Sequence, residues 1–360
     1  MHRARSIPVL EGSTRSGALV CLAILSFGAA PAHAQPGSMT RSPASHDTLS
    51  ITTREGTLLA LDVARDGRRI VFDLLGQLWV LDGNGGAARA VTDAIRDTAE
   101  DADPSLSPDG DRIVFSGERG GRRGLWLADL SGGAPRLLSH TPDGEGFDGR
   151  GAWSPDGRTI AFARVVMRVD GGESRQVSEI ALVDVTSGEI RSLRIEGVPE
   201  PDVRDPAWSP DGRRIAFVNA WVQDPGGGRV WSVAAEGGAA EPLTTEGVAA
   251  LAPAYSPDGS RIAFLARDEH DRWQIWLGEE GAPRRLTDHA DVAPTRVRWS
   301  TDGATLLYSA DGGLRRVPSE GGAPVAIPFE ATLAFARSRT ELPPVRFPAP
   351  GFAQPARGHA

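Results

Sequence analysis

A four-residue phrase, Ser-Pro-Asp-Gly, recurs along the chain and constrains its fold more than any other feature. The phrase is intact at residues 107–110, 154–157, 209–212 and 256–259. Altered copies at 64–67 and 300–303 extend the series to six. The final glycines are 43, 47, 55, 47 and 44 residues apart. Six copies at such a period indicate a repeat architecture in which each unit packs on its neighbours.

The residues of the phrase explain why it forms a tight turn. Proline sets φ near −65° at the second position, aspartate accepts hydrogen bonds from nearby backbone, and glycine adopts the positive φ that a side chain resists. Each copy is therefore expected to reverse one strand into the next.

Short apolar runs flank every copy in a fixed order. In the third repeat, Trp153 precedes the turn, 160–162 follows it, and 180–182 forms another run. A glycine turn, such as 237–238 in the fourth repeat, and an outer run, such as 284–287 in the fifth, complete the unit. β-Branched and aromatic runs bounded by turn residues are typical of strands. Each unit therefore predicts four strands, paired antiparallel.

Six such units predict an all-β fold, a six-bladed β-propeller with four antiparallel strands per blade, over residues 48–336. Radial blades fit the pattern because each blade buries its faces only against its neighbours. The 55-residue interval is the longest, and we expect its excess to form a long hairpin around 170–172. A strand at 49–53 should close the ring by pairing with 324–327 or 332–335.

The repeat also resembles a known family. The pattern W-S-P-D-G-x-x-I-A-F, followed by I-W, G-G and L-T, resembles the β-propeller repeat of periplasmic TolB-type proteins over about residues 58–329. The resemblance implies a six-bladed propeller. Residues 35–47 are expected to be a spacer, too short for a domain in front of the propeller.

The first repeat carries a second resemblance. The segments 55–57, 61–63, 66–67, 70–76 and 78–79 resemble the opening of the TolB-like propeller at the N-terminus of secreted amidohydrolases. In those proteins a metal-dependent hydrolase domain follows the propeller. Here a proline-rich segment, 337–360, follows, and it is expected to be a tail or linker.

Residues 1–34 have the features of a bacterial export signal. Arg3, Arg5 and Arg15 give a positive front, 17–30 is apolar, and 32–34 reads Ala-His-Ala, a cleavage site. We expect the mature protein to be periplasmic or secreted, with no integral membrane segment after cleavage. The single cysteine, Cys21, lies inside the signal, so the mature chain is expected to hold no disulfide and no thiolate site.

Composition and motifs argue against several functions. The formal net charge is −8, and acidic chains are repelled by nucleic acids and anionic membranes. A hydrolytic metal centre needs clustered histidines and carboxylates, yet the five histidines after residue 34 stand apart and no His-x-His pair occurs. The Gly-x-Ser-x-Gly motif of serine hydrolases is absent as well. We therefore predict no catalytic residues, no cofactor and no nucleic-acid partner.

The loops that join the outer strand of one blade to the inner strand of the next should gather at one mouth of the channel. Loops on a rigid scaffold often carry binding groups, and a ring of carboxylates there could hold Ca²⁺ or receive a basic partner segment. The alternative is solvated, turn-forming aspartates. These loops are expected to be exposed, so charge reversal should barely affect stability. The candidate contact residues are Asp101, Asp103, Asp148, Asp202, Asp205 and Asp291.

Three functions fit these expectations. The favoured one is an exported, non-catalytic propeller that binds a periplasmic or secreted protein. The second is the accessory propeller of a metal-dependent amidohydrolase, whose hydrolase domain would be the partner. The third is a metal-assisted hydrolase that uses the channel carboxylates.

Overall fold

The computed structural model describes residues 46–93, 99–141, 146–170, 173–199, 202–220, 228–245, 247–278 and 283–338. These residues belong to one compact unit, 45–360. No helix in these ranges is long and apolar enough to cross a membrane. The expected signal peptide, nearly all of the spacer and the tail beyond residue 338 lie outside the described residues.

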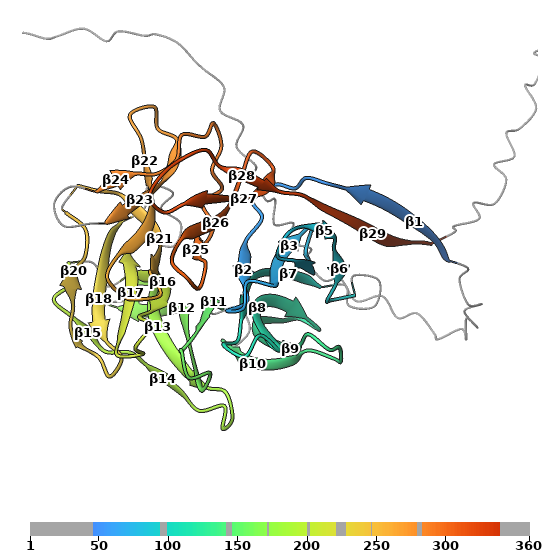
Figure 1. Ribbon diagram of the computed structural model, residues 1–360. Coiled ribbons are helices and arrows are strands. Elements are labelled where there is room, and N and C mark those ends of the chain that lie inside the picture. Colours follow the sequence, from blue (N-terminus) through green and yellow to red (C-terminus); the bar gives the residue numbers. More distant parts are fainter. Residues whose placement is uncertain are drawn as a thin grey trace, which may run out of the picture. The chain divides into compact units, whose positions relative to one another are not determined.

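Six sheets in the described part of the chain have four strands each, and the pairing within them is antiparallel (Figure 1). We number them in chain order and give each from its first strand to its last. Sheet 1 is β2 (Leu61–Val63), β3 (Arg69–Leu74), β4 (Gln77–Asp82) and β6 (Arg89–Ala90); sheet 2 is β7 (Glu100–Leu106), β8 (Arg112–Arg119), β9 (Arg122–Asp129) and β10 (Arg136–His140); sheet 3 is β11 (Gly146–Trp153), β12 (Thr159–Asp170), β13 (Glu173–Asp184) and β14 (Ile190–Ser192); sheet 4 is β16 (Val203–Trp208), β17 (Arg214–Asn219), β18 (Arg229–Ala234) and β20 (Glu241–Pro242); sheet 5 is β21 (Ala250–Tyr255), β22 (Ile262–Arg267), β23 (Trp273–Gly278) and β24 (Arg284–Arg285); sheet 6 is β25 (Arg298–Trp299), β26 (Thr305–Ala310), β27 (Gly313–Pro318) and β28 (Val325–Ile327).

Two smaller sheets bring the total in the described residues to eight, where six were expected. One contains β1 (His46–Thr53), β29 (Phe329–Ser338) and β5 (Gly86–Ala87), and the other pairs β15 (Ile195–Glu196) with β19 (Gly238–Ala239). Both β5 and β19 lie between the third and fourth strands of a four-stranded sheet and pair in parallel with a segment outside it. The extra sheets therefore arise from links between units and leave the four-stranded pattern intact.

The recurring phrase forms the predicted turn between the first and second strands. In the third repeat the Ser154 hydroxyl donates to the Asp156 carboxylate at 2.6 Å and accepts the Thr159 N–H at 2.9 Å. Asp156 also accepts the Arg158 N–H at 3.1 Å, and Gly157 has a φ of 70°. The same contacts recur at the turns that begin with Ser107, Ser209, Ser256 and Ser300. Serine and aspartate thus satisfy the turn backbone, which confirms the interpretation of the phrase.

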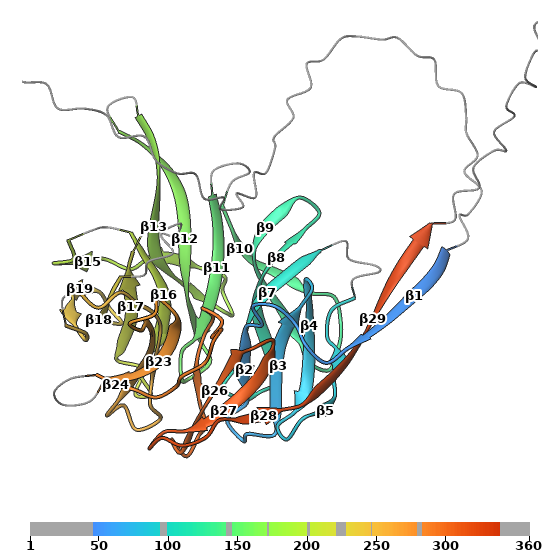
Figure 2. The ribbon, with the colours of Figure 1, turned by 90° about the horizontal axis from the view of Figure 1, so that it is seen from above.

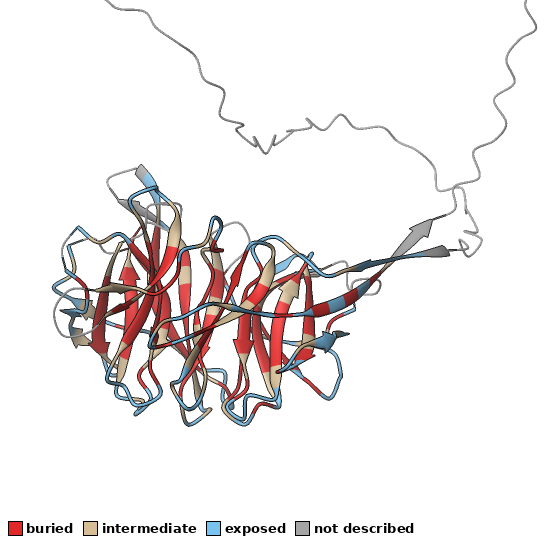
Figure 3. Ribbon diagram, turned by 45° about the horizontal axis from the view of Figure 1, so that its top comes forward, coloured by how far each residue is buried: buried red, intermediate tan, exposed pale blue. Residues whose placement is uncertain are grey.

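Each four-stranded sheet packs on the next through a buried apolar cluster. One cluster joins Val114 of sheet 2 to Phe162 and Val183 of sheet 3. Another joins Phe72 of sheet 1 to Leu307 of sheet 6. The remaining clusters join the other successive sheets, so the packing runs through all six and returns to the first. Figure 3 draws the buried residues in red, and they lie in the interior of the sheets.

The tryptophan before the turn adds a polar link to this packing. Trp153 donates its indole N–H to the carbonyl of Ser105 in the preceding sheet at 3.0 Å, and Trp299 does the same to Ala254 at 3.0 Å. Trp208 repeats the contact at 3.1 Å. Tryptophan is a large apolar side chain that carries a donor. It can therefore fill the space between two sheets and bond the backbone of one of them.

The long third repeat and the N-terminal strand behave largely as expected. β12 and β13 pair along their whole length, from Thr159 opposite Asp184 to Asp170 opposite Glu173, which confirms the long hairpin. β1 pairs with β29 from His46 opposite Ser338 to Thr53 opposite Ala331. Of the two expected partners of β1, 332–335 is therefore correct and 324–327 is wrong. The paired β1 and β29 extend away from the four-stranded sheets, as Figures 1 and 2 both show.

The indole link gives a stability prediction. Replacing Trp153 with phenylalanine keeps an aromatic ring but leaves the Ser105 carbonyl without its donor, which costs about 1–3 kcal/mol when the group is buried. Trp79 supplies a matched control, because its indole N–H is buried and has no hydrogen-bond partner. Urea unfolding should show Trp153→Phe to be less stable than Trp79→Phe. Equal losses would mean that the link contributes nothing.

Candidate functional site

A bulge in four of the first strands determines which side chains meet between the sheets. The register shifts in β7, β11, β16 and β21, in each case just before the tryptophan, tyrosine or leucine that precedes the turn. The fourth residue before the turn serine then has a positive φ of 49–55°, an unusual conformation for a non-glycine residue. These residues are Asp103, Arg150, Asp205 and Ala252. Arg296 holds the equivalent place in sheet 6.

The bulges place Arg150 between two carboxylates from the neighbouring sheets. Its guanidinium lies 2.5 Å from Asp205 and 3.9 Å from Asp103. The charge of Asp205 raises the pKa of Arg150 above its ordinary value. Burial alone would raise the pKa of Asp205, but the charges of Arg150 and Arg204 outweigh it and hold that pKa below its usual range. The pair is therefore ionised at neutral pH.

Arg296 reaches these groups from sheet 6. Its guanidinium donates to the carbonyl of Gly151 at 2.5 Å and to the carbonyl of Arg150. The side chain is buried, and burial together with the charge of Arg298 lowers its pKa to about 10. Arg296 is therefore still a cation at neutral pH, and it bonds sheet 6 directly to sheet 3. We call these residues, Asp103, Arg150, Asp205 and Arg296, together with Asp73 described next, the channel cluster.

Asp73 joins the cluster from the second strand of sheet 1. Its carboxylate accepts the N–H of Ala60 at 2.7 Å and that of Asp103 at 2.9 Å. Burial, and then the nearby charge of Asp103, raise the pKa of Asp73 to about 7. The net charge of the channel cluster therefore changes close to neutral pH.

The six carboxylates predicted for the channel mouth do not form one ring. Asp103 and Asp205 meet through Arg150, as described. Asp101 pairs with Arg119 at 2.5 Å inside sheet 2. Asp148 accepts two bonds of 2.9 Å from Arg164 inside sheet 3, and Asp202 accepts the N–H of Ser178 at 2.7 Å. Asp291 is exposed, and its carbonyl accepts the N–H of Asp311 at 2.8 Å.

The expectation that these carboxylates are exposed is therefore wrong for four of the six. Asp101, Asp148, Asp202 and Asp205 are each at most 6% exposed. The first strands begin earlier than predicted, at Glu100 in β7 and Gly146 in β11, so residues assigned to loops lie within sheets. Charge reversal at Asp101 or Asp205 would bury a second cation beside an arginine. Such changes are therefore expected to lower stability, contrary to the expectation from the sequence, whose premise of exposure fails for these residues.

A cavity of about 490 Å³ lies at the other end of the first strands, beside the turns. All six repeats line it, with Trp153, Trp208 and Trp299 among its walls. We call it the turn-end cavity. Arg298 and Asp62, both lining residues, pair at 2.7 Å. The same carboxylate accepts the Ser105 hydroxyl at 3.0 Å and the Leu106 N–H at 2.8 Å, so its oxygens are fully engaged.

Sequence reasoning missed Asp73, Arg150, Arg296 and the pair of Asp62 with Arg298. A signal for most of them was available. Asp62 and Arg298 stand two residues before the turn, where the other four repeats have serine or alanine. Arg150 and Arg296 stand four residues before it, where two other repeats carry aspartate, so opposite charges share equivalent positions. Asp73 lies in a second strand and has no such signature.

Three potential metal ligands converge at one place among the described residues, namely Asp268, Glu269 and His270 in the turn between β22 and β23. This group fits a cation poorly. One oxygen of Asp268 accepts the N–H groups of His270 and Arg272, and the other accepts two bonds from the Arg272 guanidinium at 3.0 and 2.7 Å. The carboxylate already balances a positive charge and closes the turn.

No protein-family model and no curated protein matches the chain. Solved structures resemble its fold. TolB from Acinetobacter baumannii matches with a TM-score of 0.55 at 19% identity, over 76% of this chain and 66% of that one. An oligogalacturonate lyase in complex with manganese has a TM-score of 0.53 at 18% identity, over 79% of this chain and 84% of the lyase. A puromycin-hydrolyzing peptidase of Mycobacterium tuberculosis has a TM-score of 0.52 at 21% identity, over 81% and 47%.

These likenesses establish a fold. The chain has a TolB-like β-propeller fold, as the repeat resemblance implied. It spans just under two thirds of the TolB chain and about half of the peptidase chain. At identities this low, a shared fold does not transfer the function of a neighbour to this chain.

The ion pair in the channel cluster gives a second prediction. Replacing Arg150 with leucine removes the main counter-charge of buried Asp205. Losing one partner of a buried pair costs about 3–5 kcal/mol, and the partial exposure of Arg150 favours the lower end. Without Arg150, burial would raise the pKa of Asp205, so the variant would take up a proton as pH falls from 7 to 4 and its difference from wild type should shrink.

Urea unfolding at pH 7 and pH 4 measures both effects. Arg123→Leu is the matched control, because Arg123 and Glu118 are 3.7 Å apart and both exposed. That pair should contribute less than about 1 kcal/mol. A loss for Arg150→Leu as small as that of the control, at both pH values, would contradict the role given to Arg150.

Asp73 gives a prediction about pH. Because the pKa of Asp73 is about 7, the folded protein holds this proton up to about pH 7, whereas the unfolded chain releases it near the ordinary pKa of 3.8. Wild-type stability therefore falls between about pH 4 and pH 7 as the folded state loses this advantage. Asp73→Asn removes the titration, so its free energy of unfolding, relative to wild type, should rise across that window. Asp129→Asn, at an exposed carboxylate, should run parallel to wild type, and an identical course for the two variants would exclude the assignment.

Proposed function

We propose that the chain is an exported, six-bladed, non-catalytic propeller that binds a protein partner at the turn-end cavity. The observation that carries this proposal is the cavity itself. Every repeat contributes to one recess of about 490 Å³, and recesses built by a rigid scaffold from several elements are the usual place for ligands.

The six-blade reading has its own support. Six four-stranded sheets follow one another in the chain, and each shares an apolar cluster with the next. The cluster that joins sheet 1 to sheet 6 completes the cycle. In this reading the two smaller sheets are links between blades and not additional blades.

A binding role is favoured over catalysis by the state of the channel groups. Asp62 is engaged by Arg298 and Ser105, and Asp205 is engaged by Arg150. A catalytic carboxylate must exchange protons or bonds with a substrate, whereas these carboxylates hold arginines in place. The same pairing weighs against a hydrolase whose metal is held by the channel carboxylates. It also weighs against Ca²⁺ binding by these carboxylates.

The accessory-propeller alternative is favoured by the ribbon formed by β1 and β29. Leu49 and Ile51 of β1 are 54% and 49% exposed, and they stand opposite Phe335 and Leu333 in the pairing. Leu333 belongs to the buried cluster between sheets 1 and 6. The apolar side of the ribbon thus continues the core beyond the sheets, and a hydrolase domain packed on this face would cover it.

Export from the cytoplasm is also part of the proposal. The signal-like residues 1–34 support export to the periplasm or the medium. The partner would then be a protein of the same compartment.

A capture experiment tests which end binds. Arg65 lines the turn-end cavity and is exposed, and Asp291 is exposed near the opposite end of the first strands. The mature protein is immobilised and its partners from a periplasmic extract are measured for wild type, Arg65→Glu and Asp291→Arg. Charge reversal at an exposed contact weakens binding with little effect on folding, so Arg65→Glu should reduce capture at least about fivefold while Asp291→Arg retains it.

If Asp291→Arg reduces capture and Arg65→Glu retains it, the partner binds at the channel mouth predicted from the sequence and not at the turn-end cavity. Capture that is insensitive to both variants would place the partner on the outer surface. Hydrolysis of esters, lactones or peptides that depends on added divalent metal would overturn the non-catalytic reading.

A further inference from the structure

Among the tryptophans that precede the turns, Trp208 lacks the arginine that stacks on its equivalents, Trp153 and Trp299. The guanidinium of Arg112 lies over Trp153 at 4.9 Å from the ring centre, and that of Arg261 lies over Trp299 at 5.0 Å. In both cases the arginine stands five residues after the turn serine of the preceding repeat. Cation–π contacts of this kind favour arginine because its planar group stacks on the ring.

Trp208 occupies the same place in sheet 4, but the preceding repeat has Thr159 where the others have arginine. The consequence is visible in the burial. Trp153 and Trp299 are each 8% exposed, whereas Trp208 is only partly buried. Its indole N–H still bonds to Ala152 at 3.1 Å, so the ring is held in the same way as its equivalents. The missing arginine has left an aromatic face open.

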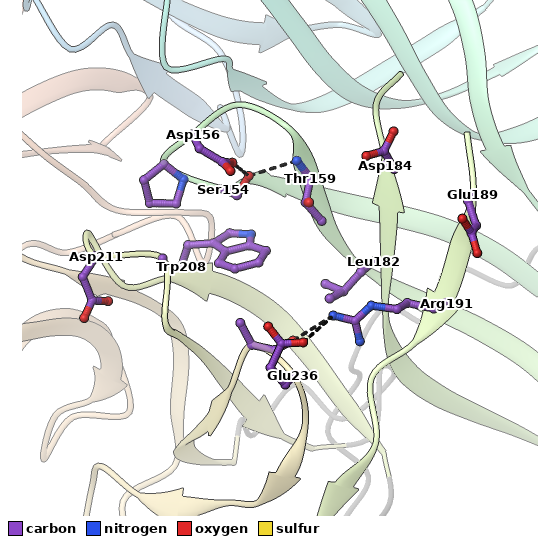
Figure 4. A pocket seen from close by; sticks show the side chains of 13 residues that line it. Ser154, Asp156, Thr159, Leu182, Asp184, Glu189, Arg191, Trp208, Asp211 and Glu236 are labelled. Atoms are coloured by element: carbon purple, nitrogen blue, oxygen red, sulfur yellow. Dashed lines mark hydrogen bonds and ion pairs between the residues drawn. The ribbon is translucent and has the colours of Figure 1, made fainter. Parts of the chain in front are cut away.

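A cavity of about 500 Å³ stands over this face, between sheets 3 and 4. Figure 4 shows Trp208 in its middle, with Thr159 on one side and Glu236 and Arg191 on the other. Five carboxylates and one guanidinium line it, so the cavity is strongly acidic. The carboxylates belong to Asp156, Asp184, Glu189, Asp211 and Glu236.

The filled equivalent between sheets 5 and 6 shows what such a cavity accepts. There the Arg261 guanidinium pairs with Glu320 at 3.1 Å and lies 3.5 Å from the carbonyl of Gly303, in addition to covering Trp299. Glu236 corresponds to Glu320, because each precedes a Gly-Gly turn, and Gly212 corresponds to Gly303 as the last turn residue. Both Glu236 and Gly212 line the open cavity. All three acceptors of a guanidinium are therefore present, and the guanidinium itself is missing.

The neighbouring arginine makes a contact that recurs in another repeat, and it does not replace the missing one. Arg191 donates to the carbonyl of Ala235 at 3.0 Å, and Arg284 makes the equivalent bond to Ser319 at 2.9 Å. Arg191 is 3.9 Å from Glu236, a long contact for an ion pair. Glu236 can therefore still pair with a cation that enters the cavity.

We infer that this cavity is a docking pocket for an arginine side chain of a partner protein, which stacks on Trp208 and pairs with Glu236. The source of that arginine rests on the proposed binding function. The affinity of the pocket for a guanidinium does not, since it follows from the repeat geometry alone. Lysine fits less well, because its compact ammonium lacks the flat face that covers the ring in the filled sites.

The test uses the purified mature chain with its tryptophan indoles labelled for NMR. It is titrated with the blocked tripeptide Gly-Arg-Gly and with the same peptide carrying lysine or neutral citrulline. The Trp208 indole signal, assigned with Trp208→Phe, should shift with the arginine peptide, respond less to lysine and stay unchanged with citrulline. Equal responses to the arginine and citrulline peptides would overturn the inference.

Three variants sharpen the result. Glu236→Gln should weaken arginine-peptide binding at least about fivefold, while Glu320→Gln, at the equivalent site that Arg261 already fills, should leave it unchanged. Thr159→Arg should abolish binding, because the chain then supplies its own guanidinium. Unaltered peptide binding by Thr159→Arg, or equal losses in the two glutamate variants, would refute the pocket. The capture experiment is independent, so a failure here leaves the binding function standing.

Discussion

The junction between successive sheets is the constraint on which the rest of this molecule depends. A single four-stranded sheet has two apolar faces and cannot bury either alone, and at each junction here apolar side chains of two successive sheets bury one another. Phenylalanines from the second strands fill the interior, as Phe162 does between sheets 2 and 3. At three of the six junctions a tryptophan on the first strand also bonds the backbone of the previous sheet. Because these parts recur at equivalent positions, a departure at one junction is recognised by comparison with the others.

Much of this could be predicted from the chain alone, for physical reasons. The Ser-Pro-Asp-Gly turn is a local structure whose hydrogen bonds form among its own residues, so its sequence suffices to identify it. The apolar runs beside it alternate with turns at short range and predict strands equally well. The long hairpin of β12 and β13 followed from the length of one interval.

The charged groups could not be placed in the same way. Whether Asp205 faces water or Arg150 depends on a bulge in β16 that changes the register, and on an arginine contributed by another repeat. An acidic loop and a buried ion pair have the same composition in one sequence. Residues 101 and 148 are predicted to lie in loops, whereas β7 and β11 begin early enough to include them. In each case the partner is an arginine on the adjacent strand of the same sheet, 18 and 16 residues along the chain, and the pairing depends on a strand register that the sequence alone does not give.

The ribbon of β1 and β29 has a mechanical consequence. Its eight residue pairs are antiparallel. The start of β1 and the end of β29 therefore lie side by side at the end of the ribbon far from the sheets, where His46 stands opposite Ser338. A pull that separates these two ends loads the pairs one after another, beginning with that outermost pair, so each step opens only one or two hydrogen bonds. The ribbon therefore unzips under small forces. The load reaches the junction of sheets 1 and 6 only after Thr53 has parted from Ala331.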